Sequence, residues 1–334
     1  MFVPTMLCAL AEVIALQWGA RAGLAFTGAI GDYFQIALTS FVIAALLWCG
    51  LPFLRQPEFR ALLPSQAASA WLRTRWPLLL FPLLISPTFN LSYTIAKSAT
   101  PHLVGFHRDW ILASADRLLL GTDAWRLTHA VIGPTGSRAL SFVYTYVWGV
   151  LFVGFGAALN LFGSVETAIR YHSARMLTWL VGGVVVAAWL SAAGPTFADL
   201  ADPRLGLEFS PLHVALTQIL PATDPLLLSQ DYLRETLTYG EVVRAGGISA
   251  MPSMHVATAA LFACVCWRSR LRWPAVIFWL TIWVSSVHFG FHYAVDGALG
   301  SLVAGLAWRA TAPFVRSGTA RLALLDRSPL PEPA

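Results

Sequence analysis

Long apolar runs dominate the chain and constrain its fold more than any other feature. A helix needs about 20 apolar residues to cross the hydrocarbon layer of a membrane. Hydrophobic residues make up 57% of the 334 residues and charged residues only 12%, which is more apolar surface than a soluble core needs. We therefore expect an all-α, polytopic integral membrane helix bundle with about eight spans, near residues 4–28, 31–54, 76–97, 139–164, 176–198, 251–267, 273–293 and 295–315.

The basic residues between these runs orient the bundle. Thirteen of the 22 Lys and Arg residues lie in the loops 55–75, 166–175 and 268–272 and in the C-terminal segment from Arg309 onward. Short basic loops stay in the cytoplasm, so we expect both termini there and the loops 98–138 and 199–250 on the opposite face. The net charge of +5 reflects this topology and indicates no nucleic-acid partner.

A single transmembrane domain is expected over residues 1–315, followed by a disordered cytoplasmic tail at 316–334. The outer loop 199–250 is long enough to hold short helices and to cover a site. The other outer loop, 98–138, has the pattern of an amphipathic helix lying on the membrane surface. Its apolar residues Trp110, Ile111, Leu118 and Leu119 alternate with the charged residues Arg108, Asp109, Asp116 and Arg117.

Two polar stretches stand out at the ends of apolar runs. GGISAMPSMH, residues 246–255, leads into one span, and HFGFHYAVDGALG, residues 288–300, joins the last two. In the second stretch His288, His292 and Asp296 are four residues apart, so a helix would place them on one face. Ionisable groups near the membrane are costly unless they are paired or functional.

The expected topology brings the two stretches together. The span 251–267 begins outside near His255, the chain turns inside at 268–272, and the span 273–293 returns His292 to the outer level. Asp296, one helical turn from His292, could hold the imidazole and leave its other nitrogen free to attack. We therefore predict a catalytic group of His255, His292 and Asp296 at the outer membrane face.

Each of these residues also has a simpler interpretation. His255 alone would suit a packed histidine at a helix end, and Asp296 could cap the last helix. His288 could ligate a metal within the His-x3-His-x3-Asp pattern, but a local hydrogen bond or a place beside the pocket is favoured. Their joint spacing favours the catalytic interpretation, and we predict no metal ligands.

The combination of Pro252-Ser253-Met254-His255 with His292-x3-Asp296 resembles the second and third signature motifs of the phosphatidic acid phosphatase type 2 superfamily. The wider sequence is most similar to the branch of the fungal inositol phosphorylceramide synthases and their bacterial relatives. The similar segments are DRLLLGTDAW at 116–125, AGPTF at 193–197 and the two stretches quoted above.

This resemblance implies a six-helix catalytic core and phosphoryl transfer without metal or cofactor. His292 would attack the phosphorus of a lipid phosphate ester, Asp296 would hold it, and His255 would protonate the leaving oxygen. Pro252, Ser253 and the N–H groups at the start of the 251–267 helix would cradle the phosphoryl oxygens, as helix N-termini favour anions.

The chain also departs from the family pattern. Ser285 and Ser286 stand where the phosphatases have a Ser-Arg pair, and the first motif, with a Lys and an Arg-Pro, is missing. The phosphate still needs cationic partners. The outer candidates are Arg108, Arg117, Arg126, Arg204 and Arg244, of which we favour Arg244 and Arg117, with His288 bordering the same site.

Three functions are compatible with these features. The first is a membrane phosphotransferase that moves a phosphorylated headgroup from a donor lipid to the hydroxyl of an acceptor lipid, as in sphingolipid synthesis. The second is a lipid or polyprenyl phosphate phosphatase with the same residues. The third, a transporter, predicts ionisable residues scattered along several helices, whereas here they cluster at one face. The Ala-, Arg- and Leu-rich composition indicates a bacterial inner membrane, with the site on the periplasmic side.

Overall fold

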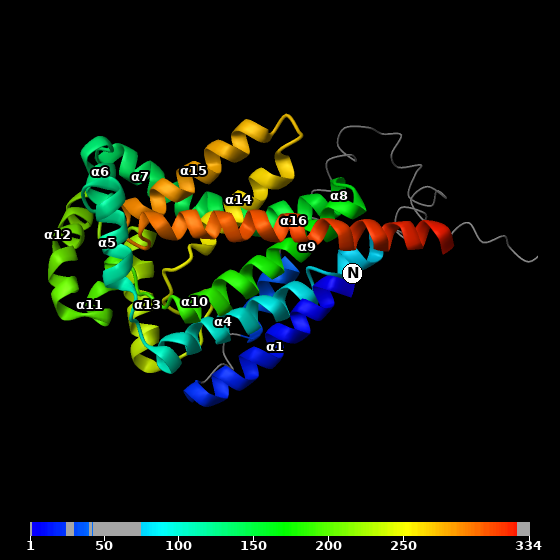
Figure 1. Ribbon diagram of the computed structural model, residues 1–334, viewed down its shortest axis with the longest axis horizontal. Coiled ribbons are helices and arrows are strands. Elements are labelled where there is room, and N and C mark those ends of the chain that lie inside the picture. Colours follow the sequence, from blue (N-terminus) through cyan, green and yellow to red (C-terminus); the bar gives the residue numbers. More distant parts are fainter. Residues whose placement is uncertain (1, 25–29, 40–41, 43–74, 326–334) are drawn as a thin grey trace, which may run out of the picture.

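The computed structural model describes residues 2–24, 30–39, 42 and 75–325, and it shows an elongated helical molecule (Figure 1). The second half of the expected span 31–54 and most of the loop 55–75 lie outside these residues. The helices are α1 (Phe2–Ala22), α4 (Ile85–Val104), α5 (Asp109–Leu120), α6 (Ala124–Val131), α7 (Pro134–Phe142), α8 (Trp148–Phe162), α9 (Val165–Leu180), α10 (Ala187–Trp189), α11 (Ala198–Ala201), α12 (Pro203–Ile219), α13 (Pro225–Tyr239), α14 (Met254–Cys266), α15 (Arg272–His288) and α16 (Ala294–Leu325).

The long helices form a bundle in which α1 packs on α4, and α9, α14 and α16 pack on one another. Three helical stretches of the described chain are long and apolar enough to cross a membrane, namely Phe2–Ala22, Arg75–Val104 and Pro134–Phe162. The third combines α7 and α8 through the π-helical turn Val143–Val147. α14 is apolar but shorter. The structure is therefore an all-helical membrane protein with three candidate spans by length and composition.

A proline lies at the break in the second of these stretches. Residues 75–80 are helical, a turn follows at 81–84, and α4 then begins at Ile85. Pro82 lies in this turn, where its missing N–H costs no hydrogen bond. The turn directs α4 along the bundle with one polar face, described below, toward the interior.

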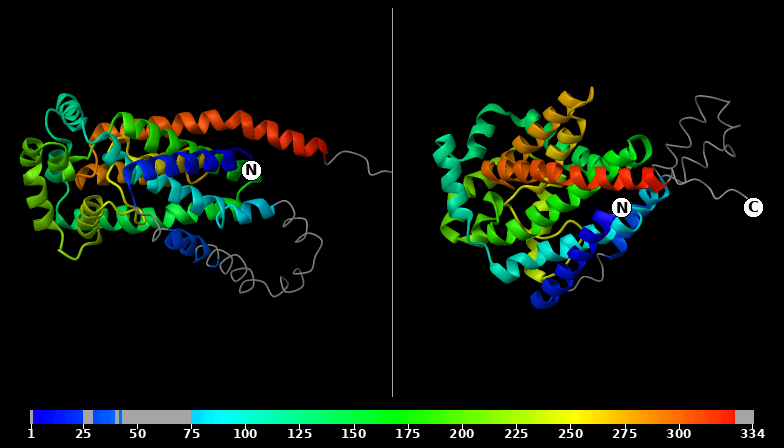
Figure 2. Two further views of the ribbon diagram at one scale, coloured as in Figure 1. Left: turned by 90° about the horizontal axis from the view of Figure 1, so that it is seen from below. Right: turned by 45° about the vertical axis from the view of Figure 1, so that its right-hand side comes forward.

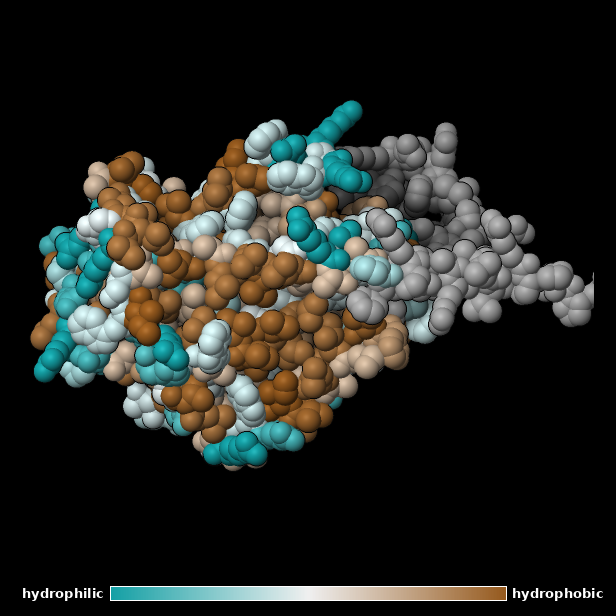
Figure 3. Space-filling model, viewed as in Figure 1, coloured by the Kyte–Doolittle hydropathy of each residue, from teal (hydrophilic) through white to brown (hydrophobic). Residues whose placement is uncertain are grey.

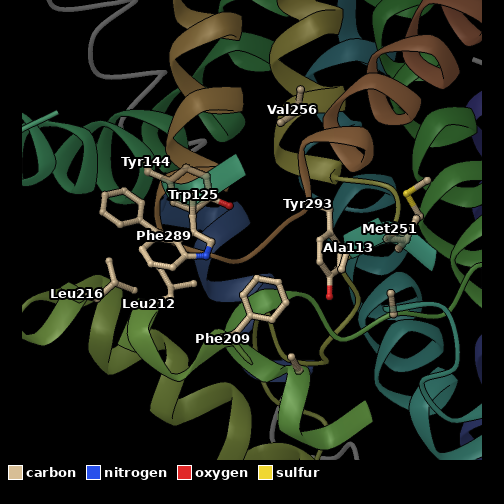
Figure 4. Packing of buried hydrophobic residues seen from close by; sticks show 14 of the residues in the cluster. Ala113, Trp125, Tyr144, Phe209, Leu212, Leu216, Met251, Val256, Phe289 and Tyr293 are labelled. Atoms are coloured by element: carbon tan, nitrogen blue, oxygen red, sulfur yellow. The ribbon is translucent and has the colours of Figure 1, made fainter. Parts of the chain in front are cut away.

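A group of shorter helices covers one end of the bundle (Figures 1 and 2). It consists of α5, α6, α11, α12 and α13, which come from the two loops that the sequence analysis placed outside. In Figure 4, Phe209, Leu212 and Leu216 of α12 point toward Phe289 and Trp125. These side chains belong to one buried apolar cluster, so the covering helices are packed against the bundle.

The outer surface of the bundle is apolar. Figure 3 shows hydrophobic residues across the middle of one face, whereas hydrophilic residues gather mainly toward its ends. Large apolar side chains also remain exposed on individual bundle helices, for example Val13, Val150, Ile277 and Leu302. Exposed apolar surface of this extent on long helices is suited to lipid.

α5 has the amphipathic character that its sequence predicted. Trp110, Ile111 and Leu118 are exposed, whereas Asp109 and Asp116 are buried against the bundle. The apolar face is therefore free to contact lipid, and the acidic face is turned into the protein.

The last helix is longer than its sequence predicted. α16 continues past residue 315 to Leu325. Of the expected tail, residues 326–334 lie outside the described chain. The segment 318–325 is rich in Ala and Leu, which favour helix, and this explains the extension.

Gly194 provides a direct test of the packing between the loops at the covered end. It has a φ of 92°, and a Cβ there would lie 2.4 Å from the Phe291 carbonyl oxygen. We expect Gly194→Ala to lower the free energy of unfolding by more than about 2 kcal/mol, because the strain and the clash act together. Thermal unfolding in detergent measures this.

Gly154→Ala is the matched control. Gly154 lies in α8 with nothing within 4 Å of an added Cβ, so its replacement should change stability by at most about 1 kcal/mol. Equal melting temperatures for the two variants would contradict the packing described for Gly194.

Candidate active site

His292 lies in a tight turn between two bundle helices. α15 ends at His288, Gly290 takes a φ of 70°, and α16 begins at Ala294. The His292 backbone N–H donates to the Ser286 carbonyl oxygen at 3.2 Å, which closes the turn. The turn places His292 at the covered end of the bundle.

The imidazole of His292 is held through one nitrogen only. Its Nδ1 lies 2.7 Å from the Ala250 carbonyl oxygen and 3.5 Å from Asp296 Oδ2. A carbonyl oxygen only accepts hydrogen bonds, so Nδ1 carries a proton, and in the neutral tautomer of the ring Nε2 has the free lone pair. The sequence analysis gave this orienting role to Asp296, but the Ala250 carbonyl makes the shorter contact.

Asp296 caps a helix and also lies beside His292, so the cap that the sequence allowed does not prevent a contact with the imidazole. It lies in the first turn of α16, where its Oδ2 accepts the backbone N–H of Tyr293 at 2.9 Å, as in half of a capping box. The same oxygen faces His292. Asp296 is fully buried, and its Oδ1 has no hydrogen-bond partner in the described structure.

His255 is held between aromatic rings in the first turn of α14. Its ring stacks on Tyr144 at 4.8 Å and 15° and lies 4.0 Å from the Trp148 ring. Trp148 Nε1 also donates to the His255 backbone carbonyl at 3.2 Å. These contacts fix the plane of the imidazole without engaging its nitrogens.

Both histidines line one large cavity of about 1280 Å³ inside the bundle. Drug-sized ligands occupy roughly 300–1,000 Å³, so this volume suits a larger, elongated molecule. Tyr144 and Leu161 both line the cavity, and the helix between them rises by about 25 Å. The cavity therefore extends from the covered end most of the way along the bundle, between mostly apolar walls.

Pro252 and Ser253 lie beside this cavity and do not line it. The Ser253 N–H donates to the Asp296 carbonyl oxygen at 3.1 Å, and its buried Oγ has no partner in the described structure. The cavity wall begins one residue later, at Met254 and His255. The first turn of α14 thus lines the same cavity as His292.

Sequence reasoning missed two buried carboxylates of α5 that hold the loops of the site. Asp109 accepts the backbone N–H groups of Ala193 and Gly194 at 3.0 and 2.8 Å, and Asp116 accepts those of Ala294 and Val295 at 2.7 and 3.1 Å. Burial raises the pKa of both carboxyl groups, and these N–H donors oppose the rise. The signal in the sequence was a pair of acids seven residues apart, hence on one face of an amphipathic helix.

Of the two places expected for His288, the structure shows the local hydrogen bonds and not a position bordering the cavity. Its Nε2 contacts Ser137 Oγ at 2.9 Å and its Nδ1 contacts Thr128 Oγ1 at 3.1 Å. The turn at Gly290 interrupts the helix, so His288 and His292 do not share one face. No cluster of three or more His, Cys, Asp or Glu side chains placed to hold a metal occurs in the described part of the chain.

Arg117 is also placed away from the cavity, contrary to the expectation for it. It forms ion pairs with Asp123 at 2.6 Å and with Glu208 at 2.7 Å, which join α5 to α12. Arg244 does line the cavity. A second cation, Lys97 of α4, lines it too, near His255, and its role was not predicted from the sequence.

Arg175 is the other cation that the sequence analysis misplaced. It was assigned to a cytoplasmic loop at 166–175, but α9 begins at Val165 and contains it. Arg175 is buried and lines the deep part of the cavity, where it donates to Asn90 Oδ1 at 3.2 Å and Ser86 Oγ at 3.1 Å. Ionisable groups thus line the cavity at two depths, which the sequence had not indicated.

The loop Ala193–Phe197 is braced from the side by an ion pair. Arg234 of α13 donates to both oxygens of Asp199, at 2.6 and 2.9 Å, and stacks over the Phe197 ring. The hydrogen bonds from Arg234 hold the pKa of Asp199 below its usual range. This contact ties α13, which forms part of the cavity wall, to the loop that Asp109 also holds.

These features define a class of protein, a helical membrane protein in which two histidines and a buried aspartate converge at the end of an apolar cavity. The model of the PAP2 superfamily matches residues 109–310, and the chain belongs to this superfamily. Its members are membrane phosphatases and phosphotransferases that act on lipid phosphates, typically without metal. No curated protein and no solved structure matches the chain.

Asp116 is expected to be essential for the stability of the turn that carries His292. Asp116→Ala leaves two buried N–H groups of α16 without acceptors, so we expect a loss of about 2 kcal/mol or more in the free energy of unfolding. Thermal unfolding in detergent measures the loss. Asp231→Ala, at an exposed site on α13, is the control and should leave stability unchanged within about 0.5 kcal/mol.

The pair of Arg234 and Asp199 should make stability depend on pH. The folded pKa of Asp199 is below its unfolded value, so the stabilisation is complete at neutral pH and is lost as the pH falls through the carboxyl range. Both side chains are partly exposed, so Arg234→Gln should cost about 0.2–1 kcal/mol at pH 7. Unfolding measured at pH 7 and pH 3 should show the difference from the native protein shrinking, and a constant difference would contradict the assignment.

Proposed function

We propose that the protein is a phosphotransferase that moves a phosphorylated headgroup between lipids through a phosphohistidine at His292. The observation that supports this most is the binding of His292 through Nδ1 alone, to the Ala250 carbonyl at 2.7 Å, in a residue that lines the cavity. A neutral imidazole held in this tautomer presents an Nε2 lone pair, as a nucleophile requires.

In the first step Nε2 of His292 attacks the phosphorus of the donor lipid. The bond between phosphorus and the lipid oxygen breaks, and His255 in its protonated form gives its proton to that oxygen. The donor leaves as an alcohol, and the phosphorylated headgroup stays on His292. Asp296 and the Ala250 carbonyl stabilise the positive charge that develops on the ring.

The second step reverses the roles. His255, now neutral, accepts the proton of an acceptor lipid's hydroxyl group, and the oxygen attacks the phosphorus. The N–P bond breaks, its electron pair returns to Nε2, and the new phospholipid leaves. The same two histidines thus serve both half-reactions, without metal or cofactor.

Lys97 and Arg244 are proposed to neutralise the phosphate. Both line the cavity with His255 and His292, and Lys97 has no ion-pair partner within the described residues. The N–H groups at the start of α14 add donors on the same side, with Ser253 behind them. Lys97 thereby takes the place that the sequence analysis gave to Arg117.

The cavity supports lipids as substrates, and its size favours transfer over hydrolysis. Its walls include Phe81, Phe152 and Trp179, against which an acyl chain would pack. A cavity filled by two lipids would exclude water from the phosphohistidine. Inositol phosphorylceramide synthesis and related sphingolipid reactions fit this scheme, and a lipid or polyprenyl phosphate phosphatase with the same residues is the alternative.

We further propose about eight spans, with both termini in the cytoplasm and the site on the outer, periplasmic face of a bacterial inner membrane. The distribution of Lys and Arg supports this orientation. The helices that cover the cavity then lie outside, where α5 would rest its exposed apolar face on the outer leaflet.

Product analysis tests the reaction. The purified protein in detergent is supplied with phosphatidylinositol and other phospholipids as donors and with ceramide or diacylglycerol as acceptors, in the presence of chelator. We expect a new phospholipid, and we expect His292→Ala to lower its formation by at least about 10³-fold, because no phosphohistidine can form. Free phosphate released from lipid monophosphates alone would indicate the phosphatase, and undiminished activity in His292→Ala would exclude the proposed nucleophile.

The cation assignment has its own test. Lys97→Gln should lower kcat/KM about 10- to 100-fold, because it removes a charged partner of the phosphate worth roughly 1.5–3 kcal/mol. Arg117→Gln, which breaks only the surface ion pairs, should keep most of the activity. A larger loss of kcat/KM in Arg117→Gln than in Lys97→Gln would instead support Arg117 as the partner of the phosphate.

A further inference from the structure

Arg175 lies deep in the cavity in surroundings that do not balance its charge. Its side chain is 4% exposed, and its hydrogen-bond partners within the described residues, Asn90 and Ser86, are neutral. The Phe152 ring lies 5.4 Å from the guanidinium and adds only a cation–π contact. A guanidinium stays protonated under all ordinary conditions, and a buried charge without a counter-charge is costly.

Other polar groups without partners surround Arg175. Tyr171 and His172 precede it by one turn in α9, and both line the cavity. The Tyr171 hydroxyl and the His172 Nδ1 are buried and have no hydrogen-bond partner in the described structure, while His172 Nε2 contacts Asn160 Oδ1 at 2.8 Å. A purely structural arginine would not need this concentration of polar groups in an apolar cavity.

This group is separate from the reaction centre. Asn90, which holds Arg175, and Lys97, beside His255, are seven residues apart on α4, which is about 10 Å along the axis. A second estimate of the depth starts from the hydrogen bond that Trp179 of α9 donates to Thr258 of α14, which places these two residues at the same level of the bundle. Arg175 lies four residues inward of Trp179, and His255 lies three residues outward of Thr258, again about 10 Å in total.

A polar face of α4 connects the two levels. Ser86, Asn90, Tyr93, Thr94 and Lys97 follow one another at helical spacing, and all of them line the cavity. Polar residues inside a membrane protein that face a cavity mark the path or the binding place of a polar ligand. The remaining wall near Arg175 is apolar, including Leu78, Phe81 and Phe152, and is suited to a hydrocarbon chain.

We propose that Arg175, with Asn90 and Ser86, forms a second anion-binding site that holds the phosphate of a membrane lipid about 10 Å deeper in the cavity than His292. An anion supplies the missing charge, and a hydrocarbon tail matches the apolar walls, which a free phosphate ion would not. The site binds its lipid whether or not His292 reacts, so it does not depend on the proposed reaction.

Native mass spectrometry of the whole protein in detergent tests the site. All measurements use the His292→Ala background, so that no turnover consumes the probe. The probe is 1-oleoyl lysophosphatidate, and the neutral comparison is monooleoylglycerol, which has the same tail without the phosphate.

We expect the protein to bind lysophosphatidate, and we expect this binding to persist in Lys97→Gln. In Arg175→Gln the affinity for lysophosphatidate should fall at least about tenfold, because a charge-assisted contact is lost. Binding of monooleoylglycerol should not change. Arg204→Gln, at an exposed site on α12, is the control for a general effect of charge and should bind as before.

Asn90→Asp separates a binding site from a structural contact. The new carboxylate lies where Asn90 Oδ1 now contacts Arg175, so it keeps the contact between α4 and α9 but occupies the guanidinium. We expect unchanged thermal stability and the same loss of lysophosphatidate as in Arg175→Gln. Normal binding of lysophosphatidate in both variants would overturn the proposal, and so would an equal loss of monooleoylglycerol. Displacement of bound lysophosphatidate by millimolar inorganic phosphate would also overturn it, because the site would then be one for the free ion.

Discussion

The energetic cost of burying polar groups in a membrane protein organises the end of the bundle where the two histidines meet. Asp109 and Asp116 are buried on one face of α5, and each carboxylate accepts two backbone N–H groups from a loop distant in sequence. Neither partner can leave without exposing an unpaired charge or unpaired donors to an apolar surrounding. As a result, the acidic side of α5 fixes both the loop at Ala193 and the start of α16, while the apolar side of α5 faces outward. This also fixes the position of His292, because its turn leads directly into α16.

The same constraint gives different results in the frame formed by α5 and in the cavity itself. At the covered end every polar group of Asp109 and Asp116 is matched by backbone donors, which makes the frame around His292 rigid. Within the cavity the match is incomplete, since Lys97 and Arg175 have no carboxylate partner in the described structure. Positive charge that the protein leaves unbalanced is available to an anionic ligand, and the proposals above assign it to lipid phosphates. The rigid frame and the unbalanced cations are therefore complementary parts of one arrangement.

Much of the fold was predictable from apolar periodicity, and much of the site from motif spacing. The helical class, the amphipathic α5 and the approach of His255 to His292 required only the length of the apolar runs and the alternation of inside and outside. The position of Arg175 could not be predicted, because a basic residue near the end of an apolar run fits a cytoplasmic loop as well as a buried helix. His288 was expected on one face with His292 because the regular spacing of four residues hid the turn at Gly290. Lys97 and the partners of Asp116 depend on contacts between distant segments, which spacing along the chain does not encode.

One wall of the cavity comes from a part of the chain that the superfamily match does not include. The match begins at Asp109, yet Tyr33, Ser86, Asn90 and Lys97 precede it and line the same cavity as His255 and His292. The cavity is thus built jointly by the matched segment and by the helices that precede it. Related enzymes could exchange or reshape the preceding helices and acquire new lipids while the histidines stay unchanged. For engineering, the positions of α4 that line the cavity deeper than Lys97, such as Ser86 and Asn90, are accordingly the place to alter the ligand preference of the cavity.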